Sequence, residues 1–120
     1  KVVRALGSKW NAGMTPVEKL RRNGIDINLG ELQKVAREYQ ISEISVFGSS
    51  IREDMSRDSD VDLLITFAAE ADVSLFDVME LEERLREIFG RPVDIVEPDS
   101  LTNPVRRRSI PANTDRLYAA

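Results

Sequence analysis

The chain contains no cysteine and no histidine among its 120 residues. Without cysteine there is no disulfide framework, no thiolate metal site and no cysteine nucleophile. Without histidine, a Ser–His–Asp triad, a histidine general base and a histidine-ligated metal are excluded as well. Acid–base chemistry must therefore fall to Asp, Glu, Lys or Tyr side chains, or to water.

Long hydrophobic runs and a basic excess are also lacking. No apolar run approaches the roughly 20 residues of a membrane-spanning helix, and no signal-peptide pattern opens the sequence, so we expect a cytoplasmic protein without membrane contact. The formal net charge of −4 disfavours nucleic acid as a partner, because proteins that grip phosphates are usually basic. The one basic run, Arg106–Arg108, fits either a solvated helix face or a docking patch for an acidic partner or a phosphate.

Length and composition fit one small α/β domain. A chain with 42% hydrophobic residues can bury a single core of this size. We expect residues 14–120 to form this domain. Residues 1–13 show neither helical periodicity nor a cap, so we expect them to be a flexible N-terminal extension.

Capping signals predict where the helices begin and end. Thr15 and Glu18 form a capping box around a proline, and Asn28 is followed three residues later by a glutamate. Ser74 opens a long amphipathic helix that Gly90 ends. The apolar stripes expected to face the core are Leu29, Leu32, Val35, Ala36 and Tyr39 in the second helix, and Leu75, Val78, Leu81, Leu85 and Ile88 in the third.

Three short apolar segments predict strands, at residues 44–47, 61–67 and 93–96. We expect a small, mixed, twisted sheet with helices packed mainly on one side. Asn103-Pro104 predicts the start of a C-terminal helix. The tail Thr114–Ala120 is predicted to form a second short helix that packs through Leu117 and Tyr118.

Two short polar motifs lie where strands end and begin. Gly48 and Ser49 follow the first strand, and after ten intervening residues Asp60 and Asp62 open the second. Glycine lets the backbone approach a phosphate closely, and Ser49 adds a hydroxyl and an N–H group. Each motif alone is common in loops and turns, but their fixed spacing between two strands favours a phosphoryl-transfer site.

The aspartates are candidates for a magnesium site. Side chains alternate along a strand, so Asp60 and Asp62 share one face, and their hard oxygens suit Mg²⁺ that also binds substrate phosphates. Asp94 is the lone acidic residue of the third strand. It either faces water at a sheet edge or, if that strand lies beside the second, completes a carboxylate triad.

The segments Phe47-Gly48-Ser49-x-x-Arg52 and Asp58–Leu64 resemble the nucleotidyltransferase superfamily related to DNA polymerase β, most closely its minimal nucleotidyltransferases. Members of that group commonly serve as antitoxins beside a HEPN-domain RNase toxin. Others in the superfamily adenylylate aminoglycosides or add nucleotides to RNA ends. Glu53 stands where family members often carry glycine.

The resemblance implies a polymerase β-like fold and the transfer of AMP from Mg²⁺–ATP to a hydroxyl, most directly a tyrosine of a HEPN toxin with which the chain forms a hetero-oligomer. Asp60, Asp62 and Asp94 would hold two Mg²⁺ ions, with Asp94 as the third carboxylate of the family pattern. Gly48 and Ser49 would bind phosphates. Arg52 would contact a phosphate, or else pair with Asp54 or Asp58.

Two other functions stay open at this point. The chain could adenylylate a small molecule, although it lacks the length for an extra domain that closes over an antibiotic. It could instead be an antitoxin that acts by binding alone, with a vestigial site. An intact carboxylate triad argues against a pure binder, which has no need to keep three repelling charges together.

Overall fold

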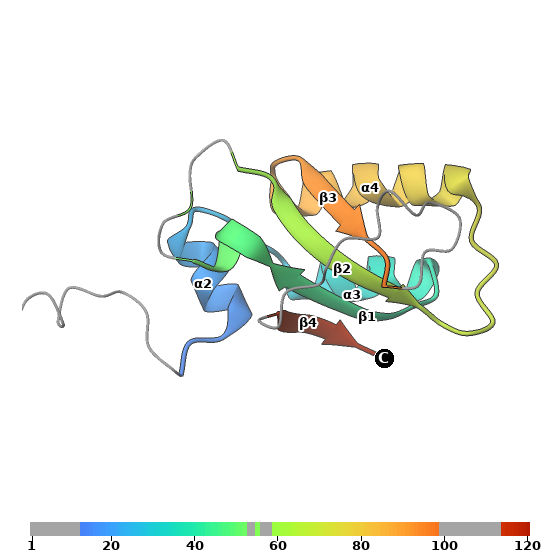
Figure 1. The fold of residues 1–120 in the computed structure, drawn as a ribbon, viewed down its shortest axis with the longest axis horizontal. Helices are drawn as coiled ribbons and strands as arrows, with labels where there is room; N and C mark the ends of the chain where they lie inside the picture. The colour runs from blue at the N-terminus through green and yellow to red at the C-terminus, as the bar shows by residue number, and fades with distance from the viewer. Residues whose placement is uncertain (1–12, 53–54, 56–58, 99–113) are drawn as a thin grey trace, which may run out of the picture.

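The computed structural model describes residues 13–52, 55, 59–98 and 114–120. Along these residues the elements are α2 (Pro16–Arg22), α3 (Leu29–Glu38), β1 (Ile41–Phe47), the 3-10 helix η1 (Gly48–Ile51), β2 (Val61–Phe67), α4 (Leu75–Phe89), β3 (Val93–Val96) and β4 (Asp115–Ala119) (Figure 1). Residues 1–12, Glu53, the helix predicted at Asn103-Pro104 and the run Arg106–Arg108 lie outside the described residues.

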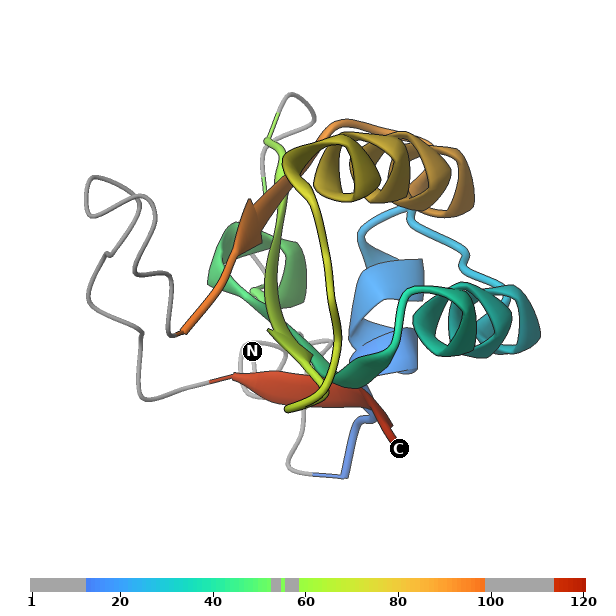
Figure 2. The ribbon, with the colours of Figure 1, turned by 90° about the vertical axis from the view of Figure 1, so that its right-hand side faces the viewer.

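The four strands form one mixed sheet in the order β3-β2-β1-β4. Strand β1 is antiparallel to both of its neighbours, whereas β2 and β3 are parallel. Parallel strands need a long crossover connection, which α4 provides here. Helices α2, α3 and α4 all lie on the same side of the sheet (Figure 2). The α/β class, the mixed sheet and the one-sided packing are thus confirmed.

The predicted helix starts are confirmed by their side-chain bonds. The Thr15 hydroxyl accepts from the Glu18 N–H at 3.1 Å, and the Glu18 carboxylate accepts from the Thr15 N–H at 2.9 Å. Asn28 caps α3, and Ser74 caps α4 in a second capping box. Gly90 ends α4 in the left-handed conformation, with φ of 70°. These helix boundaries therefore follow from local capping residues that can be read in the sequence.

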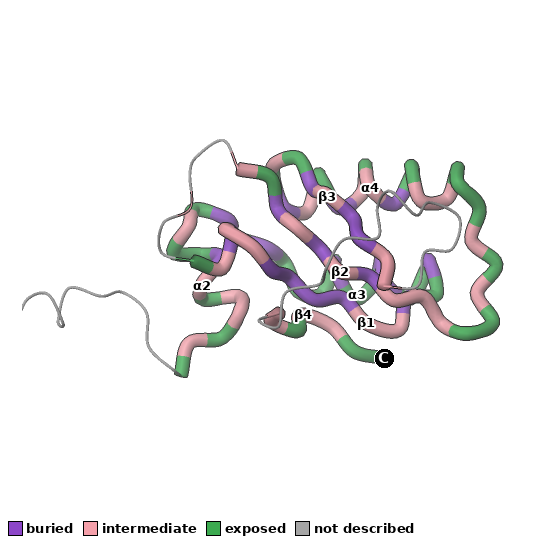
Figure 3. The backbone as a smooth tube through the Cα atoms, viewed as in Figure 1, coloured by how far each residue is buried: buried purple, intermediate pink, exposed green. Residues whose placement is uncertain are grey.

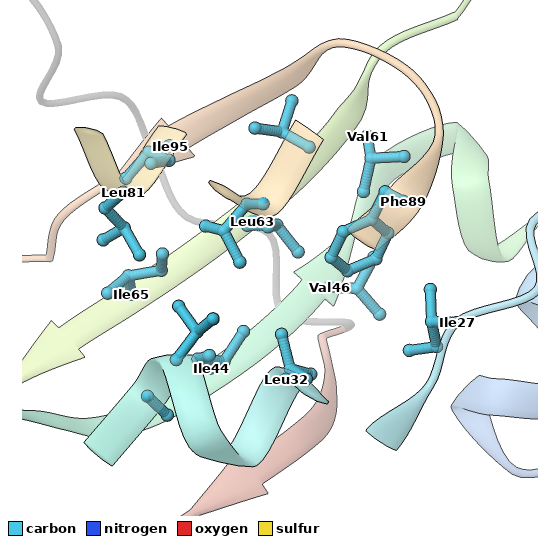
Figure 4. Packing of buried hydrophobic residues seen from close by; sticks show 14 of the residues in the cluster. Ile27, Leu32, Ile44, Val46, Val61, Leu63, Ile65, Leu81, Phe89 and Ile95 are labelled. Atoms are coloured by element: carbon cyan, nitrogen blue, oxygen red, sulfur yellow. The ribbon is translucent and has the colours of Figure 1, made fainter. Parts of the chain in front are cut away.

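The hydrophobic core lies between the sheet and the helices (Figures 3 and 4). Most of the predicted stripe residues are buried there, but Leu29 and Leu75 are 37% and 74% exposed. Each is the first residue of its helix, and the buried positions begin only at Leu32 and at Leu81. The labelled members of the core are Ile27, Leu32, Ile44, Val46, Val61, Leu63, Ile65, Leu81, Phe89 and Ile95.

The prediction of a helix over residues 114–120 was wrong, because the segment forms strand β4 against β1. A helix of seven residues gains little from propensity, since nucleation is costly. The free edge of β1 instead offers backbone partners to an extended chain. Leu117 and Tyr118 still pack against the core from this strand.

Polar contacts join α3 to α4 at the rim of the core. The buried Tyr39 donates its hydroxyl proton to Glu80, and Arg84 pairs with Glu38 at 2.8 Å. The Arg84 guanidinium also lies 6.0 Å from the centroid of the Tyr39 ring. Burial, followed by the hydrogen bond to Glu80, raises the pKa of Tyr39 above its ordinary value.

In the part of the chain that the structure describes, no helix combines the length and apolarity needed to cross a membrane.

Candidate active site

The Gly-Ser motif sits where β1 turns into η1. Gly48 has φ of +78°, in the left-handed region that favours glycine. A Cβ atom added to Gly48 would lie 2.4 Å from Oδ2 of Asp62. The two motifs, which are ten residues apart in sequence, therefore touch in the folded chain.

Strand register lines up the carboxylates. Phe47, directly before the glycine, lies opposite Asp62, and Asp62 lies beside Asp94 in the parallel pair. Neighbouring strands are about 4.8 Å apart, so the two aspartates are adjacent across the sheet. Of the two sequence readings of Asp94, this arrangement favours the one in which it joins the Asp60–Asp62 motif.

The carboxylates lie on the face of the sheet away from the helices. Val61 and Leu63 are fully buried against the helical layer, and Asp62 between them is half-buried. Asp94 is likewise half-buried between two buried neighbours in β3, and Asp60 is exposed directly before β2. Side chains thus alternate along β2 as predicted, so Asp62 and Asp94 lie on the more accessible face of the sheet, opposite the buried one. The apolar run of residues 61–67 is therefore not buried on both faces.

The backbone around Asp60 is held by the two residues that directly precede β3. The Val61 N–H donates to the carbonyl of Pro92 at 3.0 Å, and Arg91 donates to the carbonyl of Ser59 at 3.4 Å. Both contacts hold the backbone on either side of Asp60. The Asp60 side chain itself is exposed directly before the strand.

Among the described residues, no group of three His, Cys, Asp or Glu side chains is close enough to hold a metal ion by itself. Magnesium does not need such a cage. It usually keeps several waters and binds to proteins through one or two carboxylates together with substrate phosphates. The adjacent carboxylates of Asp62 and Asp94, with Asp60 nearby, are oxygen donors of the type that Mg²⁺ prefers.

Ser49 and Arg52 occupy the two ends of the short loop helix. Ser49 is half-buried, and its carbonyl accepts a bond from the Arg52 N–H at 3.0 Å. Arg52 is exposed at the end of η1. Its predicted alternative partners, Asp54 and Asp58, lie outside the described residues, so both readings of Arg52 stay predictions.

No sequence pattern indicates that Asn23 contacts the loop of this candidate site. Asn23-Gly24 predicts only the end of α2, yet the Asn23 side chain donates to the backbone oxygens of Ser50 and Arg52. These contacts span 27 and 29 residues of chain, so no local pattern could reveal them. Ser50, which is part of this loop, is fully buried.

A hollow of about 410 Å³ away from these residues is a poor place for a nucleotide. It lies where α3 ends and α4 begins. Its carboxylates would repel a triphosphate at close range. The acidic residues that line it are Glu38, Glu70, Asp72, Asp77 and Glu80.

Comparison with known sequences gives a family and relatives. Residues 31–115 match the family model described as nucleotidyltransferase domain. A protein of Methanocaldococcus jannaschii, provisionally named protein adenylyltransferase MJ1217, is 35% identical over 87 residues, which cover 72% of this chain and 85% of that protein. The protein adenylyltransferase MntA of Thermococcus cleftensis is 37% identical over 75 residues, which cover 62% and 74%.

Solved structures share the fold. A crystal structure of a toxin–antitoxin with AMP-PNP matches with a TM-score of 0.59 at 22% identity, covering 78% of this chain and 75% of that chain. A structure provisionally described as a minimal nucleotidyltransferase matches with a TM-score of 0.52 at 28% identity, covering 84% and 99%. The polymerase β-like fold is thus confirmed. The family match spans every described motif from Gly48 to Asp94, and the chain accordingly belongs to the nucleotidyltransferase domain family, as an enzyme of the minimal nucleotidyltransferase type.

Proposed function

We propose that this chain transfers AMP from Mg²⁺–ATP to a hydroxyl group of a partner protein. The observation that carries the proposal is the contact between the Gly48 loop and Asp62, with Asp94 beside Asp62 on the next strand. This juxtaposition supplies a phosphate-binding backbone and a pair of hard-oxygen ligands at one place. Relatives named protein adenylyltransferases support this choice of reaction.

Each residue has a part in the transfer. Gly48 and Ser49 would hold the β and γ phosphates of ATP through the backbone N–H groups and the Ser49 hydroxyl. The acceptor oxygen forms a bond to the α phosphorus, the bond from that phosphorus to the α–β bridging oxygen breaks, and pyrophosphate leaves. Asp94 would accept the proton that the acceptor hydroxyl loses.

Asp60, Asp62 and Asp94 would hold two Mg²⁺ ions when nucleotide is present. Bound Mg²⁺ supplies charge neutralisation at the phosphates and at the attacking and leaving oxygens. The carboxylates alone would repel a triphosphate, so nucleotide and metal should bind together. The exposed side chain of Asp60 can turn toward Asp62 to complete the set.

We further propose that the acceptor is a tyrosine of a HEPN-domain RNase toxin, with which this chain forms a hetero-oligomer as its antitoxin. Two observations support this reading. Curated relatives are named protein adenylyltransferases, and a structure of the same fold is described as a toxin–antitoxin with AMP-PNP. Modification of the toxin would silence it covalently rather than by contact alone.

The test uses the full chain with a HEPN-domain protein encoded by a neighbouring reading frame, and the absence of such a frame would count against this partner. With Mg²⁺–ATP, the intact mass of the partner should rise by one or more adenylyl units that map to tyrosine. The increase should vanish with Asp94→Asn, which keeps the side-chain shape but loses a metal ligand and the proton acceptor. Asp26→Asn, an exposed aspartate paired only loosely with Arg21 at 3.7 Å, serves as the matched control and should transfer normally.

A stable complex that silences the partner without any change in mass would overturn the enzymatic reading. The chain would then be a binding antitoxin. Loss of transfer in Asp26→Asn as well would contradict the assignment of Asp94, because the effect would no longer be specific to the site.

A further inference from the structure

Asn23, at the C-terminal end of α2, binds the loop of the candidate site, residues 48–52, through its side chain. Its side-chain Nδ2 donates to the backbone oxygen of Ser50 at 2.8 Å and to that of Arg52 at 3.0 Å. We infer that Asn23 is a positioning residue that keeps the loop in its nucleotide-binding conformation. This inference rests on the proposed function, since it concerns the phosphates of the same nucleotide.

The backbone at this place does not itself require asparagine. Asn23 has φ of −90° and ψ of 13°, in the bridge region found at turns, which does not require a left-handed backbone. The left-handed position is taken by Gly24, with φ of +82°. The two side-chain bonds to the loop are therefore what distinguishes asparagine from alanine here.

These bonds orient the peptide groups of the loop. A short 3-10 helix leaves its last carbonyls without internal partners, and Asn23 supplies donors to two carbonyls in this segment. The C=O and N–H groups of a trans peptide point in opposite directions. Turning the Ser50 carbonyl toward α2 therefore directs the N–H of the same peptide plane, that of Ile51, away from α2.

Helix α2 is a firm support for this contact. Leu20 and Ile25, on either side of Asn23, are at most 1% exposed in the core. The Lys19 ammonium also pairs with Asp115 of β4 at 2.7 Å. A helix of seven residues is not stable alone, so these tertiary contacts fix its position. Because α2 is firmly packed, its residue Asn23 restrains the loop of residues 48–52.

The experiment compares Asn23→Ala and Asn23→Asp with Asn28→Ala in the full chain. Asn28→Ala is the matched control, because it also removes a side-chain bond to backbone, the one to the Glu31 N–H at 3.1 Å that caps α3. The probe is AMP-PNP with Mg²⁺, titrated by calorimetry. Thermal melts report folding, and hydrogen exchange reports the amides of residues 48–52.

We expect Asn23→Asp to raise the Kd of Mg²⁺–AMP-PNP about tenfold or more, because its carboxylate repels the carbonyls that Asn23 holds. Asn23→Ala should raise the Kd several-fold and speed exchange in residues 48–52. Both substitutions should raise the free energy needed to order the loop for binding. The KM for ATP should therefore rise, while turnover at saturating ATP stays near the wild-type value. Asn28→Ala should lower the melting temperature and leave the Kd within about twofold.

The outcomes separate this inference from the proposed function. If the wild-type chain fails to bind Mg²⁺–AMP-PNP, the proposed function is wrong, and this inference falls with it. If the wild-type chain binds and both folded Asn23 variants bind equally tightly, the inference alone is overturned. An equal loss of affinity in Asn28→Ala would also overturn it, because general destabilisation would then explain the effect.

Discussion

The Oδ2 atom of Asp62 lies so close to Gly48 that a Cβ atom built on this glycine would be only 2.4 Å from it. Two features of this position therefore require glycine. Its φ is +78°, and the absence of a Cβ leaves room for the Asp62 carboxylate. The second of these brings the loop into contact with the sheet face that carries Asp62 and Asp94.

Gly48→Ala should therefore damage activity more than stability. The left-handed backbone costs about 1–2 kcal/mol for alanine, and the added methyl group must also displace the Asp62 carboxylate. We expect AMP transfer to be lost while the domain still folds. Thermal melts and a transfer assay measure the two effects.

Gly90→Ala is the matched control for this variant. Gly90 has a similar φ of +70°, but an added Cβ there meets no atom within 4 Å. The Gly90→Ala variant should lose about as much stability as Gly48→Ala and should keep its transfer rate. Equal losses of activity in both variants would contradict a role for the Gly48–Asp62 contact.

Asp60→Asn and Asp62→Asn should each abolish transfer without unfolding the domain. Removing one of several mutually repelling carboxylates relieves charge, so the metal-free fold should be unchanged or slightly more stable. Melts without metal and transfer assays with Mg²⁺ test both parts. Wild-type transfer by either variant would rule out the metal assignment.

ATP should stabilise the domain only when Mg²⁺ is present. At a ligand concentration near 100 times Kd, the gain in the free energy of unfolding should be about 2.7 kcal/mol. Removing the metal with EDTA should return the melting temperature to that of the free chain. Equal stabilisation by ATP with and without Mg²⁺ would show that the carboxylates do not act through a metal.

Tyr39 should make the stability fall at high pH. Burial and the hydrogen bond to Glu80 raise its pKa above the ordinary value of 10.0. The folded state therefore holds this proton more tightly than the unfolded state. The resulting stability is fully present below the ordinary pKa and is lost as the pH rises through the folded one.

Urea unfolding at about pH 8 and about pH 11 measures this effect. Tyr39→Phe should lose about 1 kcal/mol at the lower pH, from the missing hydrogen bond, and should then show a flatter decline than the wild type. Glu80→Gln keeps an acceptor without its charge and should flatten the decline in part. A decline in Tyr39→Phe as steep as in the wild type would assign the pH dependence to other groups.

Local signals predicted most of the fold. Capping residues such as Thr15 and Ser74 place the helix starts, because they satisfy N–H groups that the helix itself cannot. The apolar segments of β1, β2 and β3 also appear where expected. What failed was β4, whose conformation depends on the free edge of β1 rather than on its own residues.

Local sequence likewise predicts only some of the residues of the candidate site. Gly48, Ser49, Asp60 and Asp62 were visible as a spaced motif, whereas the place of Asp94 depended on which strands are neighbours. Only the parallel register of β2 and β3 sets Asp94 beside Asp62. The contact of Asn23 with the loop was invisible, because it joins segments whose proximity follows from the packing of α2.

Strand β4 has a consequence for how copies of this chain behave toward one another. It covers the edge of β1, a seven-residue strand rich in β-branched residues whose backbone groups would otherwise be open to pairing. Arg116 of β4 adds an ion pair with Glu43 at 3.0 Å across this junction. A fragment that ends before Asp115 would retain every proposed catalytic residue and yet present a ready template for edge-to-edge aggregation.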